Sequence, residues 1–257
     1  MNIEAGDGSG LKNSAGHADM SAGVALVIGA GGGLGAALVA QLSSAAGKPG
    51  AFGSVLALSR SSAPAIDYAD EASLSAAAQS VAAQCAEQQR DLRWLIVATG
   101  FLHGPQGQPE RSFTQLDAEY LNHVFQINAI GPALVMKHFL PLLPRQGRCV
   151  AAFISARVGS IGDNSLGGWY GYRASKAALN QFVKTASVEM SRRNKQSVCV
   201  ALHPGTVDTA LSQPFAKTGL TVRPAKEAAS DLLAVLDGLK PGDTGGLVDY
   251  KGLTLPF

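Results

Sequence analysis

The sequence predicts a single-domain α/β fold in which helices cover both faces of a doubly wound, mostly parallel sheet. Short apolar runs of strand length alternate with longer helical patterns from residue 22 to residue 257, without a break. Hydrophobic residues make up 46% of the 257 residues, which is ample for one core of this kind. Ligands of such sheets bind at the carboxyl ends of the strands, so we expect the functional residues in the segments that follow the strands.

Strands are expected at the apolar runs, and helices between them. The first strand is expected at residues 24–28, the second at 54–58, the fourth at 94–98, the fifth at 149–154 and the sixth at 198–202. Helices are expected at residues 36–42, 74–90, 120–143 and 226–239, and around Tyr172. In that last helix, spacings of three and four predict a buried stripe: Leu179, Phe182, Val183, Ala186 and Met190. Residues 1–21 have no apolar period and are expected to be a disordered extension.

Composition and charge exclude several classes of function. The net charge is only +2 and no run of lysines or arginines occurs, so neither nucleic acid nor an anionic membrane is expected as a partner. Cys85, Cys149 and Cys199 are isolated from one another, which predicts neither a disulfide framework nor a zinc site and is typical of a reducing cytoplasm. No apolar stretch reaches the ~20 residues of a membrane span. We therefore expect a cytoplasmic protein with no membrane span and no metal.

A glycine-rich segment follows the first predicted strand. Gly29, Gly33 and Gly35, with Leu34 among them, lie between an apolar run and a helical segment. Glycine permits positive φ and lets the backbone approach a pyrophosphate, which then lies at the positive end of the following helix. This arrangement predicts a nucleotide-binding turn. A glycine-rich turn that binds nothing is the alternative.

Tyr172 and Lys176 are four residues apart in a predicted helix. Their side chains are therefore expected on one face, roughly 6 Å apart at Cβ. A free tyrosine titrates near pH ~10, and a neighbouring ammonium lowers the pKa of a phenol. The pair can then donate and accept a proton at neutral pH, whereas an ordinary solvated pair on a helix surface is the alternative.

The end of the second predicted strand indicates which cofactor is used. A dinucleotide-binding fold that uses NAD usually has an acid there, but this chain has Ser59 and Arg60. An arginine can pair with a 2′-phosphate through charge-assisted hydrogen bonds, while an aspartate would repel it. We therefore predict that NADP(H) is preferred over NAD(H). An arginine that is merely exposed on a loop is the alternative.

These motifs together resemble the short-chain dehydrogenase/reductase family over residues 22–257. The likeness continues through Asn128 and through residues 203–209. Residues 159–164 and 167–180 resemble, more narrowly, the C-factor and Sniffer-type carbonyl reductase branch. The resemblance implies a Rossmann-type fold, NADPH-dependent reduction of a ketone or aldehyde with Tyr172 as proton donor, and a homodimer or homotetramer.

The resemblance also implies roles for individual residues. Asn128 would kink its helix and hold a water that relays protons to Lys176, and Lys176 would also bind the ribose hydroxyls. Asp67 would hydrogen-bond the adenine. The remaining cofactor contacts would come from the glycine turn, from Arg60 and from two further segments: Ala98, Thr99 and Gly100, and Pro204, Gly205, Val207 and Thr209.

The sequence departs from the family pattern at the carbonyl-polarising serine. Family members commonly have two successive serines after the fifth strand, the second of which polarises the carbonyl, but this chain has Ser155 and Ala156. Adjacent strand residues point to opposite faces, so Ser155 is the expected donor only if the strand end twists. Ser160, or Tyr172 acting alone, are the alternatives. The departure also leaves open a second function, an NADP(H)-binding signalling or regulatory protein with incidental turnover.

Overall fold

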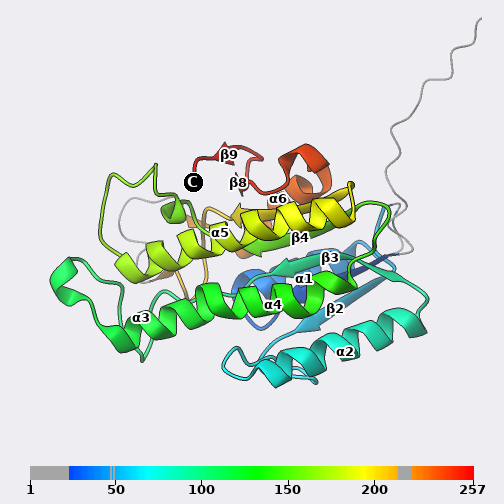
Figure 1. Ribbon diagram of the computed structural model, residues 1–257, viewed down its shortest axis with the longest axis horizontal. Helices are drawn as coiled ribbons and strands as arrows, with labels where there is room; N and C mark the ends of the chain where they lie inside the picture. The colour runs from blue at the N-terminus through cyan, green and yellow to red at the C-terminus, as the bar shows by residue number, and fades with distance from the viewer. Residues whose placement is uncertain (1–22, 47, 49, 214–221) are drawn as a thin grey trace, which may run out of the picture.

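A seven-stranded sheet lies at the centre of the computed structural model, which describes residues 23–46, 48, 50–213 and 222–257 (Figure 1). The strand order is β2-β1-β3-β4-β5-β8-β9. Neighbouring strands are parallel except β8 and β9, so the predicted doubly wound, mostly parallel sheet is confirmed. The strands are β1 (Gly23–Ile28), β2 (Ser54–Leu58), β3 (Asp91–Val97), β4 (Cys149–Ile154), β5 (Ser197–His203), β8 (Leu247–Asp249) and β9 (Thr254–Leu255). A separate parallel ribbon joins β6 (Thr206–Val207) to β7 (Val222–Arg223).

Helices cover both faces of this sheet. One face is covered by α2 (Glu71–Glu87), α4 (Gly131–Phe139) and α5 (Tyr170–Arg193), which lie in front of the sheet in Figure 1. The other face is covered by α1 (Gly33–Ser44) and α6 (Ala225–Gly238). Two buried clusters follow this division: Leu26 of β1 belongs to the first and Val27 to the second, because successive strand residues point to opposite faces.

The numbering of the strands departs from the prediction after β2, and β6 to β9 lie where no strand was predicted. Residues 94–98 are expected in a fourth strand, but residues 94–97 end the third, β3, because no strand forms in residues 59–90, all of which the structure describes. Residues 59–70 are turns instead. Ser62 Oγ lies 2.9 Å from the Ser59 carbonyl oxygen and 2.7 Å from that of Pro64. Such local side-chain bonds compete with strand pairing. The runs at 149–154 and 198–202 therefore belong to β4 and β5.

The helix expected at residues 120–143 is divided into segments. It consists of α3 (Ala118–Phe125), a π-helical turn η3 (Gln126–Ile130), α4 and a 3₁₀ turn η4 (Leu140–Leu142). The N–H of Gly131 donates to the Gln126 carbonyl, the i→i−5 bond of a π turn. Turns of this kind occur frequently at functional sites. Asn128, where the resemblance implies a kinked helix, lies in this π turn.

The stripe predicted on α5 is confirmed except at one position. Leu179, Val183 and Met190 are buried, and Ala186 packs against the same cluster. Phe182 is 41% exposed, so its place in the stripe was wrong. At ~100° per residue it lies about 70° from the centre of the stripe, at the edge of the buried face.

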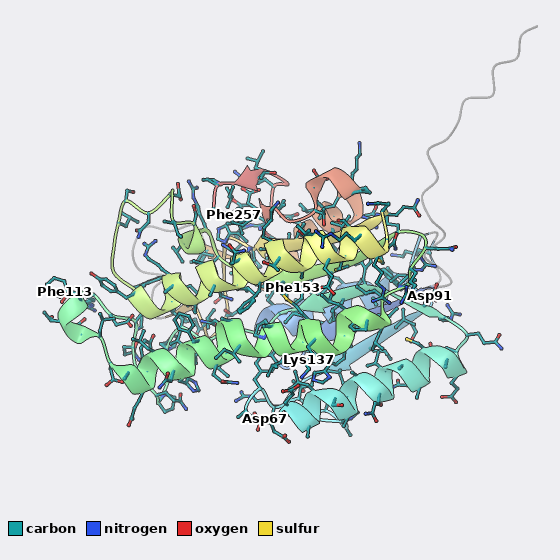
Figure 2. All side chains as sticks on the ribbon, in the orientation of Figure 1. Asp67, Asp91, Phe113, Lys137, Phe153 and Phe257 are labelled. Atoms are coloured by element: carbon teal, nitrogen blue, oxygen red, sulfur yellow. The ribbon has the colours of Figure 1, made fainter. Side chains whose placement is uncertain are left out.

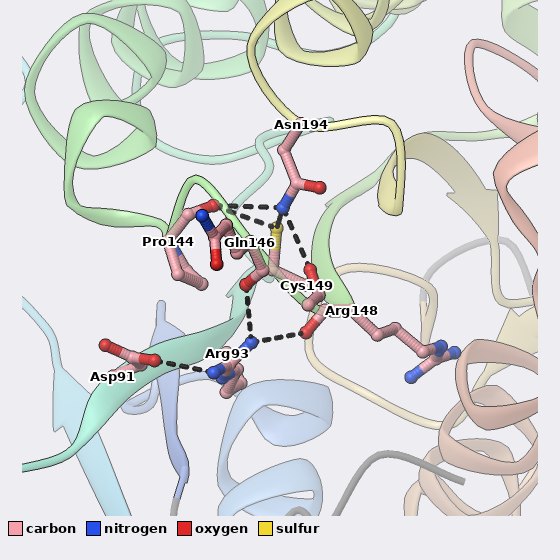
Figure 3. Close-up of polar contacts among 8 residues, drawn as sticks. Asp91, Arg93, Pro144, Gln146, Arg148, Cys149 and Asn194 are labelled. Atoms are coloured by element: carbon pink, nitrogen blue, oxygen red, sulfur yellow. Dashed lines mark hydrogen bonds and ion pairs between the residues drawn. The ribbon is translucent and has the colours of Figure 1, made fainter. Parts of the chain in front are cut away.

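Polar bonds close the amino-terminal edge of the sheet (Figure 3). Asn194 Nδ2 donates to the carbonyls of Pro144 and Gly147, at 3.0 and 2.9 Å, and Arg93 Nη1 donates to the carbonyl of Gln146 at 3.0 Å. Figure 2 shows Asp91, where β3 begins, far from Phe113 in the loops at the carboxyl edge. The loops available for a site are therefore those at the carboxyl edge.

Three expectations concern the amino-terminal extension, membrane spans and metal sites. The disordered extension expected at residues 1–21 lies outside the described residues. Within the described part of the chain, no helix is long and apolar enough to cross a membrane. The same part holds no group of three or more histidine, cysteine or acidic side chains arranged to bind a metal.

Candidate active site

Tyr172 and Lys176 lie side by side near the start of α5, as their spacing predicts. Tyr172 is 7% exposed and Lys176 is 2% exposed. Lys176 Nζ lies 5.9 Å from the centroid of the Tyr172 ring. Lysine side chains are almost never fully buried without a specific reason, so the burial of this pair favours a functional site over an ordinary surface pair.

Burial dominates the electrostatics of this pair. It lowers the pKa of Lys176 to about 7 and raises the pKa of Tyr172 above its ordinary value. A full charge ~6 Å away is worth about 3 kcal/mol at an effective dielectric constant of ~20, or roughly two pKa units, whereas complete burial shifts a pKa by up to ~3–5 units. The expectation that Lys176 lowers the pKa of the phenol is therefore wrong for the ligand-free protein. The phenol keeps its proton at neutral pH, which is the state that a proton donor needs.

Lys176 is held in place by the loop after β4. Its Nζ donates to the main-chain carbonyl of Ile154 at 2.9 Å. A Cβ at Gly159 would lie 2.8 Å from Lys176 Cβ, so only glycine lets this loop pack so closely on α5. The ammonium is thereby fixed at the carboxyl edge of the sheet.

Asn128 links three parts of the site. Its Oδ1 accepts from the N–H of Phe101 at 2.7 Å, and its Nδ2 donates to the carbonyl of Phe101 at 2.8 Å and to Ser175 Oγ at 3.1 Å. The side chain is completely buried. It therefore ties the π turn to the chain after β3 and to α5. The water relay that the resemblance implies stays a prediction.

The predicted glycine turn packs tightly against the end of β3. Gly29 has a φ of 93°, and a Cβ there would lie 2.7 Å from the carbonyl oxygen of Ala98 and 2.9 Å from Thr99 Cγ2. A Cβ at Gly35 would lie only 2.1 Å from the carbonyl oxygen of Gly29. Larger residues are excluded at both positions, because real Cβ contacts are not this short. Ala98 and Thr99 are thus brought to the glycine turn, as expected.

The next residue, Gly100, connects this corner to the catalytic pair. A Cβ there would lie 3.6 Å from Lys176 Nζ and 3.7 Å from Asn128 Oδ1. The predicted cofactor corner and the predicted catalytic residues therefore form one site.

The start of α1 is suited to an anion. Its N-cap, Gly32, has no side chain to accept from the free N–H groups, and the first turn contains no acidic residue. Gly31, Gly32 and Gly33 are exposed. A Cβ at Gly31 would lie 3.6 Å from Ser59 Cβ, so the turn faces the end of β2. Arg60 follows there, exposed and with no hydrogen bond or ion pair to any described residue.

The segment after β5 reaches the same place. Gly205, next to Pro204, has a φ of 74°, which favours glycine. Val207 lies in β6, and a Cβ at Gly33 would lie 2.8 Å from Thr209 Cγ2. Asp67, the residue expected at the adenine, is exposed in the turns after β2, where its Oδ1 accepts from the N–H of Ala69 at 2.9 Å.

Ser155 has a structural partner instead of a free hydroxyl. It is 2% exposed, and its Oγ donates to Asn180 Oδ1 at 2.7 Å. Ala156 packs in a small buried cluster with Tyr172 and Leu102. The strand end therefore presents the alanine, and not the serine, to Tyr172.

Ser160, the alternative donor, is likewise engaged locally. It is 1% exposed, and its Oγ accepts from the N–H of Asp163 at 3.1 Å. Asp163 in turn pairs with Arg157, with 2.6 Å between Oδ2 and Nε. Ser160 thus stabilises the turn after β4.

Sequence reasoning missed Glu110, which holds the start of α5. The N-cap of that helix, Trp169, is left-handed with a φ of 52° and makes no capping bond with its side chain. Glu110 is 2% exposed, and both carboxylate oxygens lie 3.2 Å from the N–H nitrogen of Gly171. A carboxylate at a helix start is favourable, and it fixes the turn that carries Tyr172. Helix caps are recognised from adjacent residues, whereas Glu110 and Gly171 are 61 positions apart.

The fold and this site together define a dinucleotide-dependent oxidoreductase. The chain belongs to the short-chain dehydrogenase/reductase family: the sequence model of the short chain dehydrogenases matches residues 23–219. An uncharacterized oxidoreductase of Schizosaccharomyces pombe is 32% identical over 207 residues, 75% of this chain and 76% of that protein. C-signal of Myxococcus xanthus is 38% identical over 143 residues, 55% of this chain and 82% of that protein. The second similarity agrees with the resemblance to the C-factor branch.

Solved structures share the fold. The carbonyl reductase Sniffer of D. melanogaster has a TM-score of 0.77 and 23% identity, covering 92% of this chain and 99% of that chain. An NADPH-bound carbonyl reductase from chicken fatty liver has a TM-score of 0.76 and 25% identity, with the same coverage of 92% and 99%. The predicted Rossmann-type fold is therefore confirmed.

The burial of Lys176 predicts a pH dependence of stability. Its pKa is lowered from 10.5 to about 7 in the folded protein, so between these pH values the unfolded chain binds one proton more at this group. This group alone makes the free energy of unfolding rise with pH, by up to about 1.36 kcal/mol per unit. In urea unfolding of the ligand-free protein, the stability of Lys176→Met relative to the parent should fall as the pH rises from about 7 to about 10.

The control for this measurement is Lys184→Met, on the exposed face of the same helix. Its stability relative to the parent should stay constant over this pH range. If the stability of Lys176→Met relative to the parent also stays constant over this pH range, burial does not neutralise Lys176 and the account is contradicted.

Proposed function

We propose that this oxidoreductase uses NADPH to reduce a ketone or aldehyde of a small molecule. The observation that carries the proposal is the buried Tyr172–Lys176 pair at the edge where the glycine turn and the Thr99–Gly100 corner meet. Arg60, exposed and unpaired among the described residues, supports NADP(H) over NAD(H). The fold shared with an NADPH-bound carbonyl reductase supports it further.

The residues around the glycine turn fit a dinucleotide. The free N–H groups at the start of α1 would bind the pyrophosphate, Arg60 the 2′-phosphate and Asp67 the adenine. The corner at Thr99 would face the ribose, and the segment from Pro204 to Thr209 would hold the nicotinamide amide. When bound, the nicotinamide supplies a hydride to the carbonyl carbon.

The protein's own residues supply the proton and the geometry. The Tyr172 hydroxyl, which burial keeps protonated, gives its proton to the carbonyl oxygen as the oxygen becomes an alkoxide. Lys176 then lies close enough to stabilise the phenolate until a proton returns, and its pKa of about 7 suits it to pass that proton on. Asn128 keeps the corner and α5 in register through Phe101 and Ser175.

A second group can assist Tyr172 by donating a hydrogen bond to the carbonyl oxygen. Ser155 has this role in the sequence prediction, and it would have to release Asn180 to act. Ser160 and Tyr172 alone are the alternatives.

The alanine beside Tyr172 favours a second function, an NADP(H)-binding signalling or regulatory protein with incidental turnover. NADPH oxidation with a panel of aldehydes, ketones and quinones separates the two functions.

A cytoplasmic location and a homodimer or homotetramer stay predictions.

Tyr172→Phe removes only the hydroxyl and should leave NADPH affinity close to that of the parent. Turnover should fall by about 10²–10⁴-fold, as is typical when a general acid is lost. Steady-state NADPH oxidation with a reducible carbonyl measures this. Tyr170→Phe, on the same helix but exposed, is the matched control and should turn over like the parent. Equal turnover by Tyr172→Phe and the parent would remove the proton-donor role.

Arg60→Ala should weaken NADPH binding by about ten- to a hundredfold and leave NADH binding nearly unchanged. The reason is the loss of a charge-assisted contact worth roughly 1.5–3 kcal/mol with a phosphate that NADH lacks. Fluorescence titration of both cofactors measures the two affinities. Arg145→Ala, an exposed arginine at the opposite edge of the sheet, should change neither. If the parent protein binds NADH as tightly as NADPH, the predicted preference is wrong.

A further inference from the structure

Tyr68 is a buried tyrosine to which the proposed mechanism gives no role. It is 6% exposed and lies in the turns that take the place of the expected third strand. Its hydroxyl lies 2.9 Å from Thr99 Oγ1, a hydrogen-bond distance. Burial raises the pKa of Tyr68 above its ordinary value, so the hydroxyl stays protonated and either group can donate.

The space that Tyr68 occupies is shaped by the π turn. A Cβ at Gly131, directly after η3, would lie 2.0 Å from Tyr68 Cδ2, so only glycine admits the ring. At the other end of η3, Gln126 Nε2 donates to the main-chain carbonyl of Tyr68. The ring and the backbone of Tyr68 are thus held by the helix that carries Asn128.

Thr99, the partner of Tyr68, occupies the centre of the cofactor corner. Its Oγ1 faces Tyr68, while its Cγ2 would lie 2.9 Å from a Cβ at Gly29 in the glycine turn. Gly100, the next residue, lies against Lys176 and Asn128. One side-chain hydrogen bond therefore fixes the residue that separates the glycine turn from the catalytic pair.

We propose that Tyr68 is a positioning residue for the dinucleotide: its hydroxyl fixes Thr99 and so orders the corner before the cofactor binds. The inference rests on the proposed function. Ordering flexible residues on binding costs free energy and so weakens affinity. A corner that is already ordered avoids part of this cost when the cofactor binds. Thr99 would face the ribose and not the 2′-phosphate, which is the group that distinguishes NADPH from NADH. The effect on affinity should therefore be the same for both cofactors.

The test measures the dissociation constants of NADPH and NADH by fluorescence titration, together with the melting temperature. Tyr68→Phe keeps the ring against Gly131 and removes only the hydroxyl. Both dissociation constants should rise about 3- to 10-fold, which corresponds to ordering one side chain on binding. Thr99→Val should give a similar rise. The double variant should bind no more weakly than either single variant, because both changes remove the same bond.

Tyr120→Phe is the matched control. Its hydroxyl is also buried and donates, over 2.8 Å, to the carbonyl of Leu102, which lies just outside the corner formed by residues 98–100. It should lower the melting temperature without changing either dissociation constant.

Four results would overturn the inference. Tyr68→Phe with a lower melting temperature and parental affinities would give Tyr68 a purely structural role. A loss confined to NADPH would place it at the 2′-phosphate, and additive effects in the double variant would separate Tyr68 from Thr99. A parent protein that binds neither cofactor would refute the proposed function itself, and this inference with it.

Discussion

The close approach of backbone segments at the carboxyl edge of the sheet is the constraint on which the site depends. The glycine turn meets the end of β3 at a distance where any side chain on Gly29 would overlap Ala98 and Thr99. Gly35 lies closer still to Gly29, which brings the start of α1 against the turn. A shift of either segment would separate the free N–H groups at the start of α1 from the corner next to Lys176. The glycines are therefore required by packing alone, whatever the turn binds.

Desolvation is the second physical condition of the site. Tyr172 and Lys176 are both removed from water, and each is shifted toward its neutral form. A neutral phenol can deliver a proton, and an amine with a pKa of about 7 can exchange one near neutral pH. The Glu110 carboxylate at the start of α5 and the Ile154 carbonyl at the end of β4 hold this pair from two directions. The start of α5 is therefore held both by the loop that carries Glu110 and by the end of β4.

Local patterns in the sequence predicted the parts of the fold and site that depend on neighbouring residues. Alternation of apolar runs placed five of the seven strands of the sheet, all but β8 and β9, and the positions of Gly29 and of the Tyr172–Lys176 pair located the site. Contacts between distant segments carried no such signal. Glu110 meets Gly171 across 61 positions and Tyr68 meets Thr99 across 31, so no periodicity marks either pair. Ser155 likewise meets its partner Asn180 across 25 positions. The missing third strand has a different cause, because the bonds of Ser62 to the carbonyls of Ser59 and Pro64 are local.

A measurement of hydride transfer is the most direct test of the central claim, that NADPH with its pyrophosphate at the glycine turn reduces a carbonyl next to Tyr172. The protein is incubated with NADPH that carries deuterium at both positions of the nicotinamide C4, together with aldehydes and ketones, and the products are analysed by mass spectrometry. The account predicts an alcohol with one deuterium on the carbinol carbon in the parent protein, and its near absence with Tyr172→Phe. Tight binding of NADPH with no deuterium in any product would contradict it.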